Sequence, residues 1–109
     1  MLCRMLEYLG LRAQPAYGPR AALMEVSQEV PKVILLDISM PGIDGFEVMA
    51  FLSRDPRLAQ VPVIVVTTDD QEETRLRSEQ AGALDVLVKP ISVASIEESL
   101  RKHHLINSE

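Results

Sequence analysis

The chain has 109 residues, of which 47% are hydrophobic and 25% are charged, and its formal net charge at pH 7 is −5. A chain of this size buries one sizeable core, and its acidic balance argues against a nucleic-acid-binding or anionic-membrane surface, because both need a basic excess. The only cysteine, Cys3, excludes an intramolecular disulfide and a cysteine-rich zinc site, and no apolar run approaches the ~18 residues of a membrane span. We therefore expect one cytoplasmic domain over residues 1–109.

Segments with helical and with strand periodicity alternate along the chain. We expect helices over residues 1–10, from Pro19, from Asp44 to Asp55, from Asp69 to Ala81 and from Ser92 onward. We expect a weak edge strand over Leu11–Tyr17, which contains Pro15, and buried strands over Lys32–Asp37, Val61–Val66 and Leu84–Val88. This alternation predicts an α/β fold in which a parallel sheet carries helices on both faces.

Residues that begin and end helices support these boundaries. Asp44, followed three residues later by Glu47, is similar to a capping box, and Ser92 is of a type that caps helix N-termini. Gly10 follows an apolar helical segment and Gly82 follows a polar one, and each glycine is expected to end its helix.

Three polar residues follow the three buried strands: Asp37, Thr67 and Lys89. The carboxyl ends of parallel strands meet at one rim of the sheet, where α/β proteins bind their ligands. A carboxylate, a hydroxyl and an ammonium close together suit nucleophilic phosphoryl transfer, because the carboxylate can attack phosphorus while the other two stabilise charge on its oxygens. Each residue alone is typical of a turn, a cap or a solvated loop, so the prediction depends on their order and on the turn Met40-Pro41-Gly42 after Asp37.

These segments resemble the receiver domains of response regulators in two-component signalling, of the chemotaxis type. Residues 35–47 resemble the phosphoacceptor segment, residues 61–68 the fourth strand with its switch hydroxyl, and residues 81–90 the fifth strand with its Lys-Pro turn. The resemblance covers nearly the whole chain. It implies a flavodoxin-like, doubly wound parallel sheet in a three-layer α/β/α arrangement.

The resemblance also implies roles for individual residues. Asp37 would accept a phosphoryl group from a histidine kinase or a phosphotransfer protein. Thr67 would bond a phosphoryl oxygen and shift inward on activation, and the Thr68 backbone amide would contact the phosphoryl group. Lys89 would pair first with Asp37 and then with the phosphate, and the Lys89–Pro90 peptide bond would be cis.

Further implications concern magnesium and the output of the domain. Asp37 and the backbone carbonyl of Ser39 would be magnesium ligands. The face formed by the fourth helix, fifth strand and fifth helix would dock a downstream protein that the sequence does not name. Such a domain accepts a phosphoryl group and can lose it again, but it is not expected to turn over a substrate of its own.

The chain departs from the family pattern at two places. Receivers open with a strand that ends in an acidic pair holding magnesium, whereas Met1 already lies in what resembles the first helix, so we expect the first strand and the acidic pair to be missing and magnesium to bind weakly. Asp69 and Asp70 are replacement candidates by proximity alone. Val86 stands where the family often has Tyr or Phe; we interpret it as strand core, so that output would rest on backbone shifts.

A missing central strand has consequences for stability. Its burial would contribute about as much free energy as the net stability of a domain, about 5–15 kcal/mol. Three explanations are open: the chain is an incomplete copy of a receiver, the predicted edge strand closes the gap, or two chains pair as a homodimer.

Two other functions compete with the phosphoacceptor. A pseudo-receiver would be a protein-interaction module that acts without phosphorylation, and the missing acidic pair favours it. A phosphatase of the haloacid-dehalogenase type also uses an Asp, a Thr or Ser, and a Lys, but it needs a second Asp where this chain has Ser39.

Overall fold

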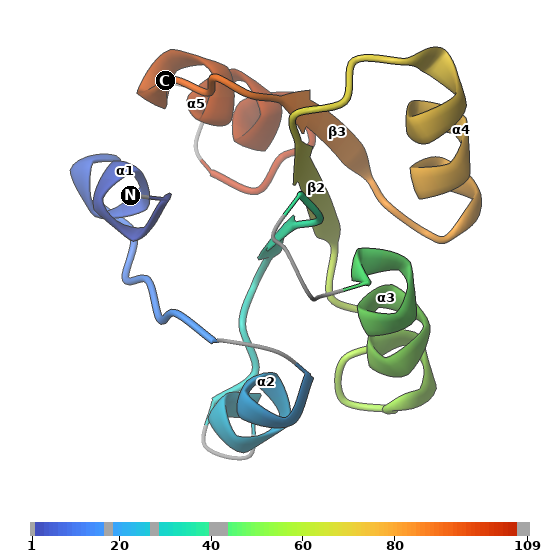
Figure 1. Ribbon diagram of the computed structural model, residues 1–109. Helices are drawn as coiled ribbons and strands as arrows, with labels where there is room; N and C mark the ends of the chain where they lie inside the picture. Colours follow the sequence, from blue (N-terminus) through green and yellow to red (C-terminus); the bar gives the residue numbers. More distant parts are fainter. Residues whose placement is uncertain (1, 17–18, 27–28, 40–43, 107–109) are drawn as a thin grey trace. The chain divides into compact units, whose positions relative to one another are not determined.

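The structure is a computed structural model that describes residues 2–16, 19–26, 29–39 and 44–106 (Figure 1). The chain divides into two compact units. The sheet unit is Ala16–Lys89, and the terminal unit combines Met1–Pro15 with Pro90–Glu109. All strands of the described residues, and every residue of the predicted site except Pro90, belong to the sheet unit.

Helices and strands alternate from α2 to α5, which confirms the predicted α/β class. The helices are α1 (Leu2–Tyr8), α2 (Pro19–Val26), α3 (Gly45–Arg54), α4 (Glu72–Gln80) and α5 (Val93–Lys102). The strands are β1 (Ile34–Asp37), β2 (Val63–Thr67) and β3 (Asp85–Val88). Within the described residues, every helix is too short or too polar to cross a membrane.

The strand expected over Leu11–Tyr17 is wrong. Residues 11–16 form no strand, and Tyr17 lies outside the described residues. A strand forms when its backbone N–H and C=O groups make hydrogen bonds with a neighbouring strand, and Pro15 has no N–H to donate. In the sheet that the structure describes, β1 pairs with β2 alone, so the segment does not close the sheet beside β1.

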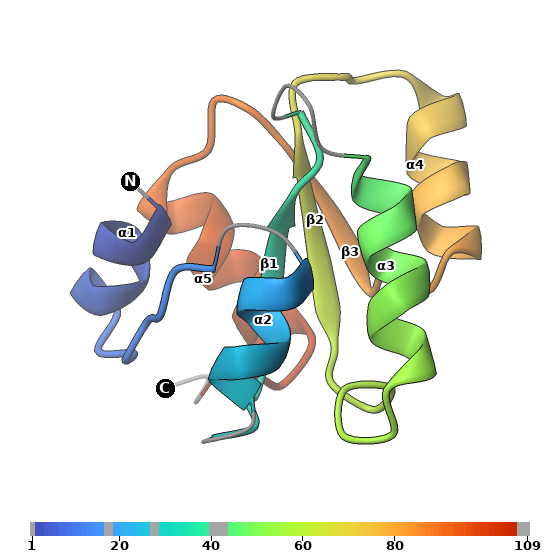
Figure 2. The same ribbon diagram turned by 60° about the horizontal axis from the view of Figure 1, so that its bottom comes forward.

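The central strand of the sheet is β2, which pairs in parallel with β1 on one side and β3 on the other (Figure 2). Ile34 stands opposite Val63, and Ile64 stands opposite Asp85. All five residues of β2 are buried, whereas all four of β1 are partly buried. Of these two predicted apolar runs, the one in β2 is therefore the more buried, because β2 has a neighbouring strand on each side.

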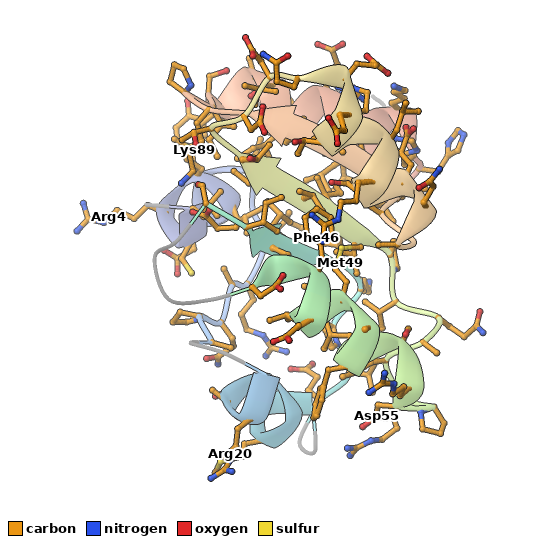
Figure 3. All side chains as sticks on the ribbon, turned by 45° about the vertical axis from the view of Figure 1, so that its right-hand side comes forward. Arg4, Arg20, Phe46, Met49, Asp55 and Lys89 are labelled. Atoms are coloured by element: carbon orange, nitrogen blue, oxygen red, sulfur yellow. The ribbon has the colours of Figure 1, made fainter. Side chains whose placement is uncertain are left out.

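Helix α3 covers one face of this sheet. Met49 of α3 packs in one buried cluster with Val63, Val65 and Val86, and Phe46 contacts its edge. Figure 3 shows Phe46 and Met49 on the side of α3 that faces the strands. A second cluster consists of Val48 and Leu52 of α3 together with Leu58, which follows the helix. The helix thus packs against residues of β1 and β2.

The predicted caps at Asp44 and Ser92 are confirmed, whereas α4 begins at Glu72 and not at the predicted Asp69. Asp44 caps α3, because its Oδ1 accepts hydrogen bonds from the N–H groups of Phe46 and Glu47. Ser92 caps α5 in a reciprocal pair with Ser95. Gly82 follows α4 with φ +107°, a conformation that glycine adopts without strain. In the terminal unit, α1 lies beside α5.

The first residue of α3, Gly45, is packed tightly against Ile38, which directly follows β1. A Cβ atom at position 45 would overlap the Cβ and Cγ2 atoms of Ile38 and would lie 3.1 Å from its Cα. Glycine therefore lets the helix start beside the end of β1, next to Asp37.

Gly45→Ala is expected to lower the free energy of unfolding by about 1–3 kcal/mol, because the added methyl overpacks the contact with Ile38. Urea unfolding measures the change. The control Ala50→Ser, at an exposed position of α3, should change stability by at most about 0.5 kcal/mol. Equal stability of the two variants would contradict the tight packing at Gly45.

Candidate functional site

The carboxyl ends of the three strands are joined by backbone hydrogen bonds. The Ile38 N–H donates to the Val66 carbonyl at 2.9 Å, and the Lys89 N–H donates to the Thr67 carbonyl at 2.7 Å. Because the strands are parallel and in register, the residues that end them lie along one rim. The structure therefore places Asp37, Thr67 and Lys89 at three adjacent strand ends.

Asp37 is held through both of its carboxylate oxygens. Its Oδ2 lies 2.6 Å from Lys89 Nζ. Its Oδ1 accepts hydrogen bonds from the Ser39 N–H at 2.9 Å and the Ser39 hydroxyl at 2.8 Å. The Asp37 side chain is 19% exposed and that of Lys89 is 33% exposed, so both are partly shielded from water.

The surroundings of Asp37 keep it ionised. Partial burial raises the pKa of Asp37, but the hydrogen bonds from Lys89 and Ser39, together with the positive charge of Lys89, outweigh it and leave the pKa below its ordinary value. At neutral pH the site therefore holds a carboxylate, which is the nucleophilic form.

The Thr67 side chain is buried, and its hydroxyl accepts a hydrogen bond from the Asp69 N–H at 3.0 Å. Thr68 is exposed, and Val86 is 4% exposed within the cluster under α3, a position that agrees with strand core. Pro90 follows Lys89 in the chain; the cis form of that peptide bond stays a prediction.

Sequence reasoning missed two contributions. The Ser39 hydroxyl bonds Asp37, whereas only the Ser39 carbonyl had been assigned a role. The Asp69 amide bonds Thr67, whereas Asp69 had been considered only as a metal ligand. Both contacts join residues two apart, the spacing at which Asp and Thr side chains bond nearby backbone, so the spacing itself was the available signal.

The described residues offer magnesium a minimal set of protein ligands. Magnesium takes one or two carboxylates with waters and substrate phosphates. Among the described residues, no three Asp, Glu, His or Cys side chains gather where they could hold a metal ion. Asp69 accepts hydrogen bonds from Thr74 and from the Gln71 N–H. Asp37 and the Ser39 carbonyl remain as the predicted ligands.

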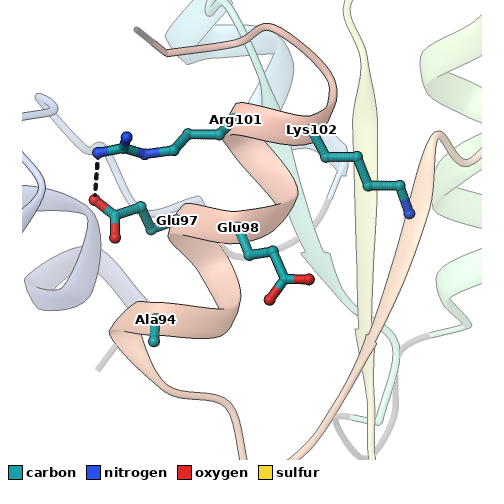
Figure 4. A pocket seen from close by; sticks show the side chains of 5 residues that line it. All are labelled: Ala94, Glu97, Glu98, Arg101 and Lys102. Atoms are coloured by element: carbon teal, nitrogen blue, oxygen red, sulfur yellow. Dashed lines mark hydrogen bonds and ion pairs between the residues drawn. The ribbon is translucent and has the colours of Figure 1, made fainter. Parts of the chain in front are cut away.

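A shallow hollow lies on α5 in the terminal unit (Figure 4). Its lining is Ala94, Glu97, Glu98, Arg101 and Lys102. The Arg101 guanidinium lies 2.9 Å from the Glu97 carboxylate, one helical turn away. Charges of both signs meet there in a pair that is typical of a solvated helix face.

Residues 1–101 match the family of the response regulator receiver domain. The chain belongs to this family. It is 39% identical over 101 residues to Protein PilH of Pseudomonas aeruginosa, which covers 93% of this chain and 80% of that protein. It is 32% identical over 106 residues to the phosphate regulon transcriptional regulatory protein PhoB of Escherichia coli, which covers 94% of this chain and 46% of PhoB.

Solved receivers share the fold. The chemotaxis protein CheY4 of Vibrio cholerae superposes with a TM-score of 0.83 at 25% identity, covering 94% of this chain and 85% of that chain. The receiver domain of a sensor histidine kinase from Pseudomonas aeruginosa, which has a magnesium ion coordinated in its active site cleft, superposes with a TM-score of 0.77 at 26% identity, covering 91% and 81%. The flavodoxin-like α/β prediction is confirmed.

Lys89→Met is expected to raise the pKa of Asp37, because burial still disfavours the carboxylate while its cationic partner is gone. The variant should also be less stable at neutral pH. Since the folded pKa is depressed, the stability from this pair is present above the unfolded value of 3.8 and is lost as pH falls through the folded pKa. Carboxyl ¹³C NMR during a pH titration measures the shift.

Asp55 is the internal control for this titration, because its pKa is lowered by a hydrogen bond from Arg57 and not by Lys89. Its pKa should be the same in both proteins. An unchanged Asp37 pKa in Lys89→Met would contradict the ion pair.

Proposed function

We propose that Asp37 accepts a phosphoryl group from the phosphohistidine of a histidine kinase or a phosphotransfer protein, and that the modified domain alters a protein-docking face. The observation that supports this most is the 2.6 Å contact between Lys89 Nζ and Asp37 Oδ2 at the carboxyl ends of the strands. An ammonium there keeps the carboxylate ionised and lies where it can pair with the negative oxygens of an incoming phosphoryl group.

The transfer itself exchanges one bond for another. A carboxylate oxygen of Asp37 attacks the phosphorus, the P–N bond to the donor imidazole breaks, and the imidazole takes up a proton as it leaves. Lys89 then pairs with a phosphoryl oxygen, while the Thr67 hydroxyl and the Thr68 amide bond the others. One group is accepted for each chain, so the domain is a substrate of its kinase and has no independent turnover.

Receivers bind magnesium, and in this chain the Asp37 carboxylate and the Ser39 carbonyl would hold it. When bound, the ion would neutralise phosphoryl charge. The described residues supply one carboxylate to it, so we propose that magnesium binds weakly.

The pseudo-receiver is the second candidate, and the same shortage of carboxylates favours it. The phosphatase reading is weaker. Its acid–base carboxylate would be at position 39, where the Ser39 hydroxyl instead bonds Asp37 Oδ1. A serine hydroxyl does not shuttle protons near neutral pH as a carboxylate does.

Incubation with acetyl phosphate and magnesium is expected to add one phosphoryl group, which intact mass spectrometry detects. Asp37→Asn should abolish the gain, because the amide is not a nucleophile of this kind. Asp55→Asn is the matched control, since Asp55 is also paired with a cation, Arg57, but follows α3 and not a strand.

The competing functions give different results in this assay. No mass gain in the wild-type chain supports the pseudo-receiver. Sustained hydrolysis of a generic phosphate ester supports the phosphatase. Labelling that survives in Asp37→Asn would show that another residue is the acceptor.

Self-association is a further expectation. In the sheet that the structure describes, β1 is an edge strand, and its apolar residues are only partly buried. Open apolar edges pair readily with other strands. Light scattering over a concentration series should show a dimer, and a monomer that melts cooperatively at every concentration would contradict this expectation.

A further inference from the structure

The side of β1 that faces away from β2 carries a row of backbone groups. In the described sheet, β1 lies at one edge (Figure 2). The N–H groups of Ile34 and Ile38 each donate, at 2.9 Å, to a carbonyl within or directly before β2. Backbone groups alternate in direction along a strand. The N–H and C=O groups of Val33, Leu35 and Asp37 therefore point to the open side, where the described sheet has no further strand.

Neither end of this row can be extended by a further donor. Two residues before Val33 is Pro31, which has no N–H group. Two residues after Asp37 is Ser39, whose N–H already donates to Asp37 Oδ1 at 2.9 Å. The donors and acceptors on the open side are thus confined to three residues that are arranged symmetrically about Leu35.

The side chains of β1 leave apolar surface uncovered. All four of its residues are partly buried, whereas every residue of β2 is buried. Ile34 and Leu36 pack against the clusters that α3 covers, and Leu35 lies on the opposite face. Exposed edge strands are commonly blunted by Lys, Pro or a bulge. The β1 strand contains neither Lys nor Pro, and the charge of Asp37 is paired with Lys89.

We propose that this edge pairs with the same edge of a second copy of the chain, antiparallel about a two-fold axis at Leu35, to form one continuous sheet. The proposal rests on the self-association proposed above and not on phosphoryl transfer. In an antiparallel pair, opposite residues exchange both of their N–H···O=C bonds. Leu35 then faces Leu35 of the second copy, and Val33 faces Asp37 of the second copy, so all three residues of the row find partners.

Other registers leave donors or acceptors without partners. A shift by two residues in one direction sets Val33 opposite Ser39, whose N–H is already used by Asp37. A shift in the other direction sets Asp37 opposite Pro31, which cannot donate. The two limits of the row therefore coincide when the partner is the same edge, and this match favours a second copy over an unrelated strand.

The same register joins apolar side chains to apolar side chains. Ile34 faces Leu36 of the second copy on the face that α3 covers, and the two Leu35 side chains meet on the other face. Cross-strand apolar pairs of this kind stabilise antiparallel sheets. The pairing would thus cover the partly exposed side chains of β1 together with its backbone groups.

Amide exchange of the full chain, followed by NMR over a concentration series, tests the pairing. The Leu35 and Asp37 amides should exchange about ten-fold more slowly once about 90% of the chains are paired, because only unpaired chains exchange there. The Ile34 and Ile38 amides are internal controls, since they donate within one chain at every concentration. Leu35 protection that does not depend on concentration, or a dimer with an unprotected Leu35 amide, would overturn the proposal.

The register is read from a mixture of isotope-labelled and unlabelled chains. An Hα–Hα NOE between Ile34 of one chain and Leu36 of the other is expected, because these residues form a non-hydrogen-bonded pair, in which the backbones approach most closely. Intermolecular NOEs that place a different segment opposite Ile34 would contradict the proposed pairing.

A matched pair of variants separates the backbone group from the side chain at the two-fold axis. Leu35→Pro removes the central outward N–H and no bond to β2, a position at which edge strands tolerate proline. Leu35→Ala also shortens the side chain but keeps the N–H. Analytical ultracentrifugation should show Leu35→Pro dimerising about ten-fold more weakly than Leu35→Ala, since the N–H is lost from both copies. Equal dimerisation of the two variants would overturn the proposal.

Two further conditions keep the test decisive. Should Leu35→Pro not fold, the concentration dependence of the wild-type Leu35 amide decides alone. None of these measurements uses a phosphoryl donor. A monomeric chain would therefore overturn the pairing and leave the phosphoacceptor proposal standing, whereas a paired chain that acetyl phosphate does not label would support the pairing and contradict phosphoryl acceptance.

Discussion

The ion pair between Asp37 and Lys89 is the interaction on which the site depends. Asp37 ends β1 and Lys89 follows β3, so the pair bridges the two outer strands of the described sheet across the end of β2. Neighbouring strands lie about 4.8 Å apart, so this bridge spans roughly 10 Å and needs a side chain as long as lysine. The pair places an ammonium over the rim and lowers the pKa of the carboxylate beneath it. Both effects support the proposed phosphoryl acceptance.

Around this pair, the strands and α4 are stabilised in different ways. The β2 strand is buried along its whole length, and tight packing against α3 extends to Gly45. Helix α4, in contrast, is held by the hydrogen bond from Thr74 to Asp69 and by its arginines. A buried sheet resists displacement because its packing is close to that of a crystal, whereas exposed polar contacts exchange with water at little cost. The domain thus combines a closely packed rim with a neighbouring helix that is held mainly by polar contacts.

The chain belongs to the receiver family, but its described residues gather few carboxylates for a magnesium site. The match to receiver domains runs through residues 1–101, and the strand ends carry the expected acid, hydroxyl and amine. The carboxylates that would complete a magnesium site are not gathered among the described residues. The Ser39 hydroxyl and Lys89 instead satisfy both oxygens of Asp37. For the proposed phosphoryl acceptance, Lys89 would leave the Asp37 oxygen and pair with a phosphoryl oxygen.

The sequence by itself determined the α/β class, the three buried strands, the caps at Asp44 and Ser92, and the order of Asp37, Thr67 and Lys89. These features follow from local rules, namely apolar runs, capping chemistry and the residues at strand ends. Only the tertiary structure decided that residues 11–16 form no strand, because strand formation depends on a neighbour that local sequence does not reveal. It also decided which groups bond. Lys89 pairs with Asp37, which lies 52 positions away in the sequence, and the Thr67 hydroxyl accepts a hydrogen bond from the Asp69 N–H. Periodicity assigns residues to elements, but distances between side chains arise only when those elements pack.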